Sequence, residues 1–122
     1  MPTVTILLAE QDLVAACSLA ASLDSQFCSL RVFASVDVLR AAIPQSHADA
    51  VVADLETISL AEVSRLRRDF GLPVICTHRI PDDELWTAAI EAGANDVCVK
   101  TDVLALRRAI TRTGPTARPL AA

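Results

Sequence analysis

The stretch that decides the fold lies near the end of the chain and runs EAGANDVCVK over residues 91–100. A segment of helical period ends at Gly93, and glycine is the residue that most often follows the last turn of a helix. An apolar run at residues 97–99 comes next, and Lys100 ends it. Helix, glycine and short strand in this order indicate one step of a chain that alternates between helices and strands.

The same alternation continues towards the N-terminus. Four more short aliphatic runs are found, at residues 4–9, 30–34, 50–53 and 74–76. They begin roughly two dozen residues apart, a spacing typical of βα units with short loops. Segments of helical period lie between them, and the first, residues 13–23, has apolar residues on one expected face: Leu13, Ala16, Cys17, Ala20 and Leu23.

Capping signals mark several of the expected helices. Asp12 is a candidate N-cap of the first helix, and Thr101 or Asp102 of the last, which carries Val103, Leu106 and Ile110 on one face. The carboxylates at residues 82–84 suit the positive end of the dipole of the helix at residues 85–92. The proline-containing residues 114–122 are expected to be a flexible tail or the start of a linker.

Five βα repeats predict a parallel sheet with helices on both faces, a three-layer α/β/α sandwich. The first, third and fourth runs are apolar throughout, as strands covered on both faces are. The second run has Arg31 at its centre, which favours an edge strand.

Composition limits the class of protein. The 122 residues suffice for one domain, with 52% hydrophobic and 21% charged residues. A net charge of −4 and 3% aromatic residues argue against direct nucleic-acid binding. We find no signal peptide and no apolar run long enough for a membrane helix, and we expect a cytoplasmic protein. The four cysteines are expected to be small buried hydrophobic residues in a reducing compartment, because their spacing fits no zinc site.

Polar residues follow the expected strands where each strand ends. Glu10, Gln11 and Asp12 follow the first run, and Asp54 and Glu56 follow the third. The fourth and fifth are followed by residues 77–79 (Thr, His, Arg) and by Lys100. Ligands of open α/β sheets bind at the carboxyl ends of the strands, so we expect these side chains to meet at one rim.

The chain resembles a receiver domain of a two-component response regulator, up to its final helix. The matching stretches are residues 6–10, 48–55, 72–75, 91–94 and 97–100, in the order and at the separations of that family. The resemblance implies a flavodoxin-like, CheY-like fold with five parallel strands in the order 2-1-3-4-5. It also implies a receiver-like domain over residues 1–113.

The resemblance further implies a phosphoryl switch rather than an enzyme with a separate substrate. Asp54 is the expected phosphoacceptor, and a histidine kinase or phosphotransfer protein the expected donor. Mg²⁺ is expected at Glu10, Asp54 and the backbone carbonyl of Glu56, with Gln11 as a doubtful fourth ligand. Lys100 is expected to contact the phosphoryl group, together with Thr77 or His78, between which the sequence does not decide.

Departures from the family pattern favour a divergent receiver. Gln11 stands where the family has a second acidic residue, and the lost charge weakens Mg²⁺ binding. Val97 takes the switch position, where the family has an aromatic residue. The alternative function is therefore a pseudo-receiver, a protein-interaction module that works without phosphorylation. A flavin carrier is disfavoured because acidic residues follow the first strand.

Two other features bear on partners. Trp86 is expected either to pack half-buried over a neighbour or to anchor a partner interface. The resemblance implies a homodimer through the helix at residues 85–92 and the final helix. Most clusters of basic residues are solvated faces, and we assign that role to Arg65, Arg67, Arg68, Arg107, Arg108 and Arg112.

Overall fold

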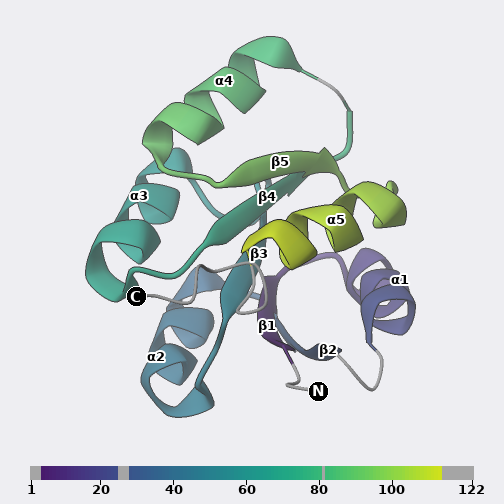
Figure 1. The fold of residues 1–122 in the computed structure, drawn as a ribbon, viewed down its shortest axis with the longest axis vertical. Coiled ribbons are helices and arrows are strands. Elements are labelled where there is room, and N and C mark those ends of the chain that lie inside the picture. Colours follow the sequence, from purple (N-terminus) through teal and green to yellow (C-terminus); the bar gives the residue numbers. More distant parts are fainter. Residues whose placement is uncertain (1–3, 25–27, 81, 114–122) are drawn as a thin grey trace.

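A computed structural model describes residues 4–24, 28–80 and 82–113 of the chain (Figure 1). Five strands alternate with five helices along these residues. The strands are β1 (Val4–Ala9), β2 (Cys28–Phe33), β3 (Ala50–Asp54), β4 (Val74–His78) and β5 (Asp96–Val99). The helices are α1 (Leu13–Leu23), α2 (Val36–Ser46), α3 (Leu60–Phe70), α4 (Asp83–Ala92) and α5 (Val103–Thr113).

The strands form one parallel sheet in the order β2-β1-β3-β4-β5. This confirms the predicted fold class and strand order. It also confirms that the Arg31-containing strand is an edge strand, although that strand runs over Cys28–Phe33 rather than residues 30–34. Every residue of the central strand β3 is buried, as expected for a strand covered on both faces.

Alternate residues of each strand build two separate cores. Leu7 and Val51 belong to the layer under α2, α3 and α4, where Leu39, Val63 and Ala89 pack. On the opposite face, the core under α1 and α5 is formed by the following buried residues: Ile6, Leu8, Val52, Leu19, Leu106 and Ile110. Figure 1 shows these two helical layers on either side of the sheet.

Helix ends follow the predicted capping pattern. The Asp12 carboxylate accepts hydrogen bonds from the Val14 and Ala15 amides at the start of α1. Asp82 caps α4, and Asp102 caps α5 by accepting from the Ala105 amide. Gly93 ends α4 with a φ of 120°, a conformation that L side chains rarely adopt.

The predicted face of α1 was wrong in part, because only Ala16 and Leu23 of its five residues are buried. The helix buries Ala16, Leu19 and Leu23, whereas Leu13 is 72% exposed and Cys17 is exposed. The expectation of four buried cysteines therefore holds only for Cys76 and Cys98, because Cys28 is half-buried. Apolar residues occupy nearly every position of α1, so periodicity alone does not distinguish the buried face.

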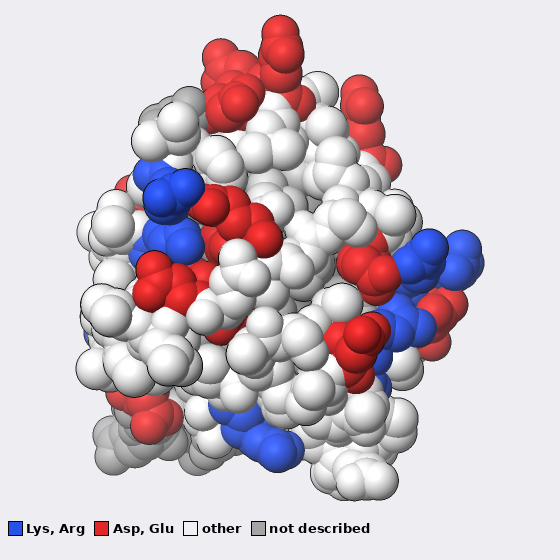
Figure 2. All heavy atoms as spheres, turned by 180° about the vertical axis from the view of Figure 1, so that it is seen from behind, with Lys and Arg blue, Asp and Glu red and all other residues white. Residues whose placement is uncertain are grey.

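Charged side chains of both signs are interspersed on the surface. On the face seen in Figure 2, basic side chains lie beside acidic ones instead of forming one basic patch. Arg65 pairs with Glu62, and Arg112 pairs with Asp96. These pairs fit the predicted solvated faces.

Within the described ranges, no helix is long and apolar enough to cross a bilayer. The predicted tail at residues 114–122 lies outside the described residues.

Candidate functional site

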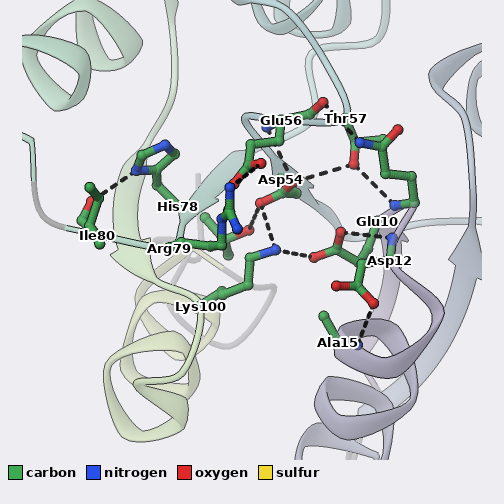
Figure 3. Close-up of polar contacts among 12 residues, drawn as sticks. Glu10, Asp12, Ala15, Asp54, Glu56, Thr57, His78, Arg79, Ile80 and Lys100 are labelled. Carbon is green, nitrogen blue, oxygen red and sulfur yellow. Dashed lines mark hydrogen bonds and ion pairs between the residues drawn. The ribbon is translucent and has the colours of Figure 1, made fainter.

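The carboxyl ends of four strands bring the expected site residues together (Figure 3). Ala9 of β1 lies beside Ala53 of β3, so Glu10 and Asp54 follow side by side. Asp54 is in register with Thr77 of β4. Lys100 follows β5 and reaches back to both carboxylates. The predicted rim is thus a single cluster in space.

Asp54 is buried, with 1% of its surface exposed, and both of its oxygens have protein donors. The Lys100 ammonium lies 3.2 Å from Oδ1, and the Thr77 hydroxyl donates to the same oxygen at 3.4 Å. The Glu56 amide and the Thr57 hydroxyl donate to Oδ2, at 3.2 and 3.4 Å. These four donors therefore position both oxygens of a group that can act as a nucleophile.

Glu10 shares the same cation. Its Oε1 lies 2.8 Å from Lys100 Nζ, and its Oε2 accepts from the Asp12 amide at 3.2 Å. Burial acts to lower the pKa of Lys100, but the hydrogen bond that Lys100 donates to Glu10 and the charge of Asp54 outweigh it and raise that pKa above its ordinary value. Lys100 is therefore a fixed positive charge between two buried carboxylates.

Of the two candidates for the hydroxyl position, Thr77 is the residue at Asp54. Its side chain is fully buried and directed at Oδ1. The His78 ring points away, with Nδ1 2.8 Å from the Ile80 carbonyl oxygen (Figure 3). Successive strand residues face opposite sides of the sheet, which accounts for the difference.

Gln11 does not contact Asp54. Its Nε2 donates to the Glu56 carbonyl at 3.4 Å, and its amide donates to the Thr57 hydroxyl at 3.0 Å. The loop after β1 is in this way tied to the loop after β3, directly above the site.

Two polar contacts at the site were not predicted from the sequence, although Arg79 itself was expected at the rim. Thr57 bridges Gln11 and Asp54 through its hydroxyl. Arg79 forms a bidentate pair with the Glu56 carboxylate, with Nε 2.6 Å from Oε1 and a terminal nitrogen 2.9 Å from Oε2. Only their positions in the sequence could have indicated these contacts, because Thr57 lies three residues after Asp54 and Arg79 lies two residues after Thr77.

The remaining candidates lie away from the carboxylates. Val97 is buried in β5, within the core under α2, α3 and α4. Trp86 of α4 is half-buried and packs against that same core. Its indole nitrogen is buried and has no hydrogen-bond partner within the described part of the chain.

The oxygen ligands at this rim are of the type that binds a hard divalent cation, but their net negative charge is small. Glu10, Asp54 and the Glu56 carbonyl present oxygens, which are the ligands that Mg²⁺ prefers. Gln11 adds a neutral amide, and Lys100 already neutralises part of the carboxylate charge. Among the described residues, no group of three or more acidic, histidine or cysteine side chains could hold a metal ion. The residues therefore fit Mg²⁺ in the type of ligand but offer it less negative charge than a site with a further carboxylate would.

Comparison with known proteins finds similarity to solved structures. No protein-family model matches the chain. No curated protein matches it either. The chain is similar to a response regulator of Chloroflexus aurantiacus, with 23% identity, a TM-score of 0.82, and coverage of 93% of this chain and 98% of that chain.

Two further solved structures show the same likeness. A receiver domain of an HD domain-containing protein from Pseudomonas fluorescens has 18% identity and a TM-score of 0.80, covering 91% of this chain and 94% of that one. The response regulator RcsB of Salmonella typhimurium, described for its DNA interaction, has 15% identity and a TM-score of 0.83 over 92% of this chain. The present chain spans 60% of the length of that protein.

These likenesses define the class of fold. The chain has the fold of response regulator receiver domains, in a divergent, CheY-like form.

Proposed function

We propose that the chain is an atypical receiver in two-component signalling, with Asp54 as its phosphoacceptor. The observation that carries the proposal is the pairing of one buried carboxylate oxygen with both a cation and a hydroxyl. Lys100 Nζ and Thr77 Oγ1 both contact Asp54 Oδ1. These groups would stabilise the negative charge of a transferred phosphoryl group.

The proposed step is phosphoryl transfer from a phosphohistidine of a histidine kinase or phosphotransfer protein. An Asp54 oxygen forms a bond to phosphorus while the P–N bond breaks. The electron pair of that bond returns to the ring nitrogen of the protonated imidazole, which leaves as neutral imidazole. Lys100 and Thr77 orient the carboxylate and stabilise the product. We propose no catalysis beyond uptake and slow loss of this group, and we place the reaction in the cytoplasm.

Glu10, Asp54 and the Glu56 carbonyl are the residues that would hold Mg²⁺, with the Gln11 amide oxygen as the weakest ligand. When bound, Mg²⁺ supplies positive charge that neutralises the phosphoryl oxygens. We propose that its affinity is low, because Gln11 contributes no charge and Lys100 competes for the same carboxylates.

The alternative function is that of a pseudo-receiver, which binds partners without phosphorylation. It is favoured by Gln11, whose amide donates to the Glu56 carbonyl instead of leaving that oxygen to a metal. Val97 at the switch position favours it as well. A partner, or a second copy of the chain, would then bind at the α4–α5 face, where Trp86 is the candidate contact.

The test is a titration with beryllofluoride, an analogue of the aspartyl phosphate, followed by amide-correlation NMR in the presence of Mg²⁺. We expect shifts at Asp54, Thr77 and Lys100 in the wild-type chain and none in Asp54→Asn. The folding of that variant is checked by circular dichroism. If the folded wild-type chain shows no shift at millimolar Mg²⁺, phosphorylation is not its mechanism and the interaction module is favoured.

A further inference from the structure

Arg79 is a cation at the mouth of the site whose function the preceding argument leaves open. It lies in the loop after β4, two residues beyond Thr77, and pairs with the side chain of Glu56. The Glu56 amide in turn donates to Asp54 Oδ2. Figure 3 shows the guanidinium beside the Asp54–Lys100 cluster. A pocket of about 230 Å³, lined by Glu56, His78, Arg79 and Ile80, opens at this point.

The Arg79–Glu56 pair is exposed to solvent. The Arg79 side chain is 69% exposed and the Glu56 side chain 35%. Exposed ion pairs contribute little net stability, so Arg79 can leave Glu56 for a stronger anion at low cost. A phosphoryl group is such an anion, since it carries more charge than a carboxylate and accepts bidentate hydrogen bonds from a guanidinium.

Arg79 is also within electrostatic reach of the phosphoacceptor. The hydrogen bond that Arg79 donates to Glu56 is the main reason why the pKa of Arg79 is raised above its ordinary value, and the charge of Asp54 acts in the same direction. A phosphoryl group on Asp54 carries about two negative charges where the free carboxylate carries one, so this neighbourhood would gain about one negative charge. The attraction that already acts on Arg79 would increase accordingly.

The charges at the rim favour a second phosphate-binding cation. The carboxylates of Glu10, Asp12, Asp54 and Glu56 are opposed by Lys100 and Arg79, which leaves two negative charges in excess. Gln11 is neutral, so the site attracts a divalent metal less strongly than it would with a carboxylate at this position. The metal therefore contributes less to neutralising a phosphoryl group.

We propose that Arg79 is a second phosphate-binding cation, which leaves Glu56 to contact the phosphoryl group on Asp54. This inference rests on the proposed function and deepens it. Lys100 on the buried side and Arg79 on the exposed side then supply the countercharge, so that phosphoryl binding depends only weakly on Mg²⁺.

The experiment measures the affinity for beryllofluoride by isothermal titration calorimetry, once with 10 mM Mg²⁺ and once without divalent metal. The wild-type chain, Arg79→Ala, Arg79→Lys and Arg112→Ala are compared. Arg112 is a matched control, because it is also an exposed arginine in an ion pair, with Asp96 at the start of β5, at the opposite end of that strand from Lys100. Circular dichroism checks that all variants fold.

We expect the wild-type affinity without Mg²⁺ to lie within about tenfold of the affinity with it. Without Mg²⁺, Arg79→Ala should bind at least about tenfold more weakly than wild type, a loss worth about 1.4 kcal/mol. Arg79→Lys should recover part of the loss, since it keeps the charge but not the bidentate geometry. Arg112→Ala should bind as wild type does.

Two outcomes would overturn the inference while leaving the proposed function intact. The first is wild-type binding that needs Mg²⁺, and the second is equal affinity of wild type and Arg79→Ala in its absence. A wild-type chain that binds no beryllofluoride under either condition would overturn both proposals. Asp54→Asn, which must not bind, distinguishes binding at this site from binding elsewhere.

Discussion

At the scale of single residues, Lys100 is the group on which the site depends most. Glu10 and Asp54 are each 1% exposed and share its ammonium. Buried charges without a partner are strongly destabilising. We therefore expect Lys100→Met to lower the free energy of unfolding by about 3–5 kcal/mol, measured by urea denaturation at pH 7.

The matched control is the double variant Lys100→Met with Glu10→Gln. Removing one carboxylate charge relieves the repulsion between Glu10 and Asp54, so this variant should recover part of the lost stability. If Lys100→Met unfolds at the same urea concentration as wild type, the ion pairs of Lys100 with Glu10 and Asp54 do not stabilise the fold.

The sequence predicts part of this site because strand register is a strong constraint. Glu10, Asp54 and Lys100 each follow a strand, and parallel strands end at the same edge of the sheet. Thr77 could not be distinguished from His78, because the choice depends on which residue of β4 faces Asp54. The pairing of Arg79 with Glu56 was missed because it is made between two loops, whose conformations no periodicity predicts.

At the scale of elements, the two glycines that end helices differ in what they tolerate. Gly71 after α3 has a φ of 66°, and a Cβ there would meet nothing within 4 Å. Gly93 after α4 has a φ of 120°, and a Cβ there would lie 3.1 Å from Arg67 Cγ. Only Gly93 thus combines backbone strain with a close contact.

We expect Gly71→Ala to lower the free energy of unfolding by about 1–2 kcal/mol, the ordinary cost of left-handed backbone for an alanine. Gly93→Ala should lower it by at least about 1 kcal/mol more, because it adds a steric contact to the strain. Urea denaturation of both variants measures the difference. Equal losses would mean that Arg67 and the backbone after α4 adjust without cost.

The helices differ in how well their buried faces can be predicted from the sequence. The last helix was predicted well, since Leu106 and Ile110 alternate there with arginines. The buried face of α1 was not, because its apolar residues surround the helix and Leu13 and Val14 are left exposed. Periodicity identifies a buried face only where polar residues mark the opposite one.

At the scale of the whole molecule, alkaline pH limits stability. Burial raises the pKa of Cys76 to about 12 and that of Cys98 to about 11, above an ordinary value of 9.0. Between these values the unfolded chain releases thiol protons that the folded chain keeps, so stability is lost as pH rises above about 9. Each thiol contributes about 1 kcal/mol per pH unit in this range.

Lys100 also lowers the stability of the folded chain as pH rises, but at higher pH than the thiols. Its folded pKa is raised, so its contribution is complete below the unfolded value of 10.5 and is lost as pH rises through the folded value. We expect unfolding free energies measured in urea to be level from pH 7 to 8.5 and to fall from pH 9 upward. Cys76→Ala should fall less steeply above pH 9. An unchanged slope would contradict the role given to this thiol.

The architecture as a whole was the most predictable property of the chain. Five apolar runs with helical segments between them can be buried together only as a sheet covered on both faces, and the two cores follow from the alternation of side chains along each strand. β1 coincides with its predicted run, whereas the other four strands differ from theirs by one or two residues at one or both ends. In β3 and β4 the difference arises because the polar residues Asp54 and His78 still belong to the strands.

The single tryptophan has an optical consequence. The chain contains one Trp and no Tyr, so its near-ultraviolet emission comes almost entirely from Trp86. That indole lies on α4, which follows the loop that carries Arg79, and it is half-buried against the core under α2, α3 and α4. Val97 of β5 is buried, and the fluorophore of this chain lies on the neighbouring helix α4. A rearrangement of the loop between β4 and α4 would change the wavelength at which Trp86 emits, so it can be followed without an added fluorescent label.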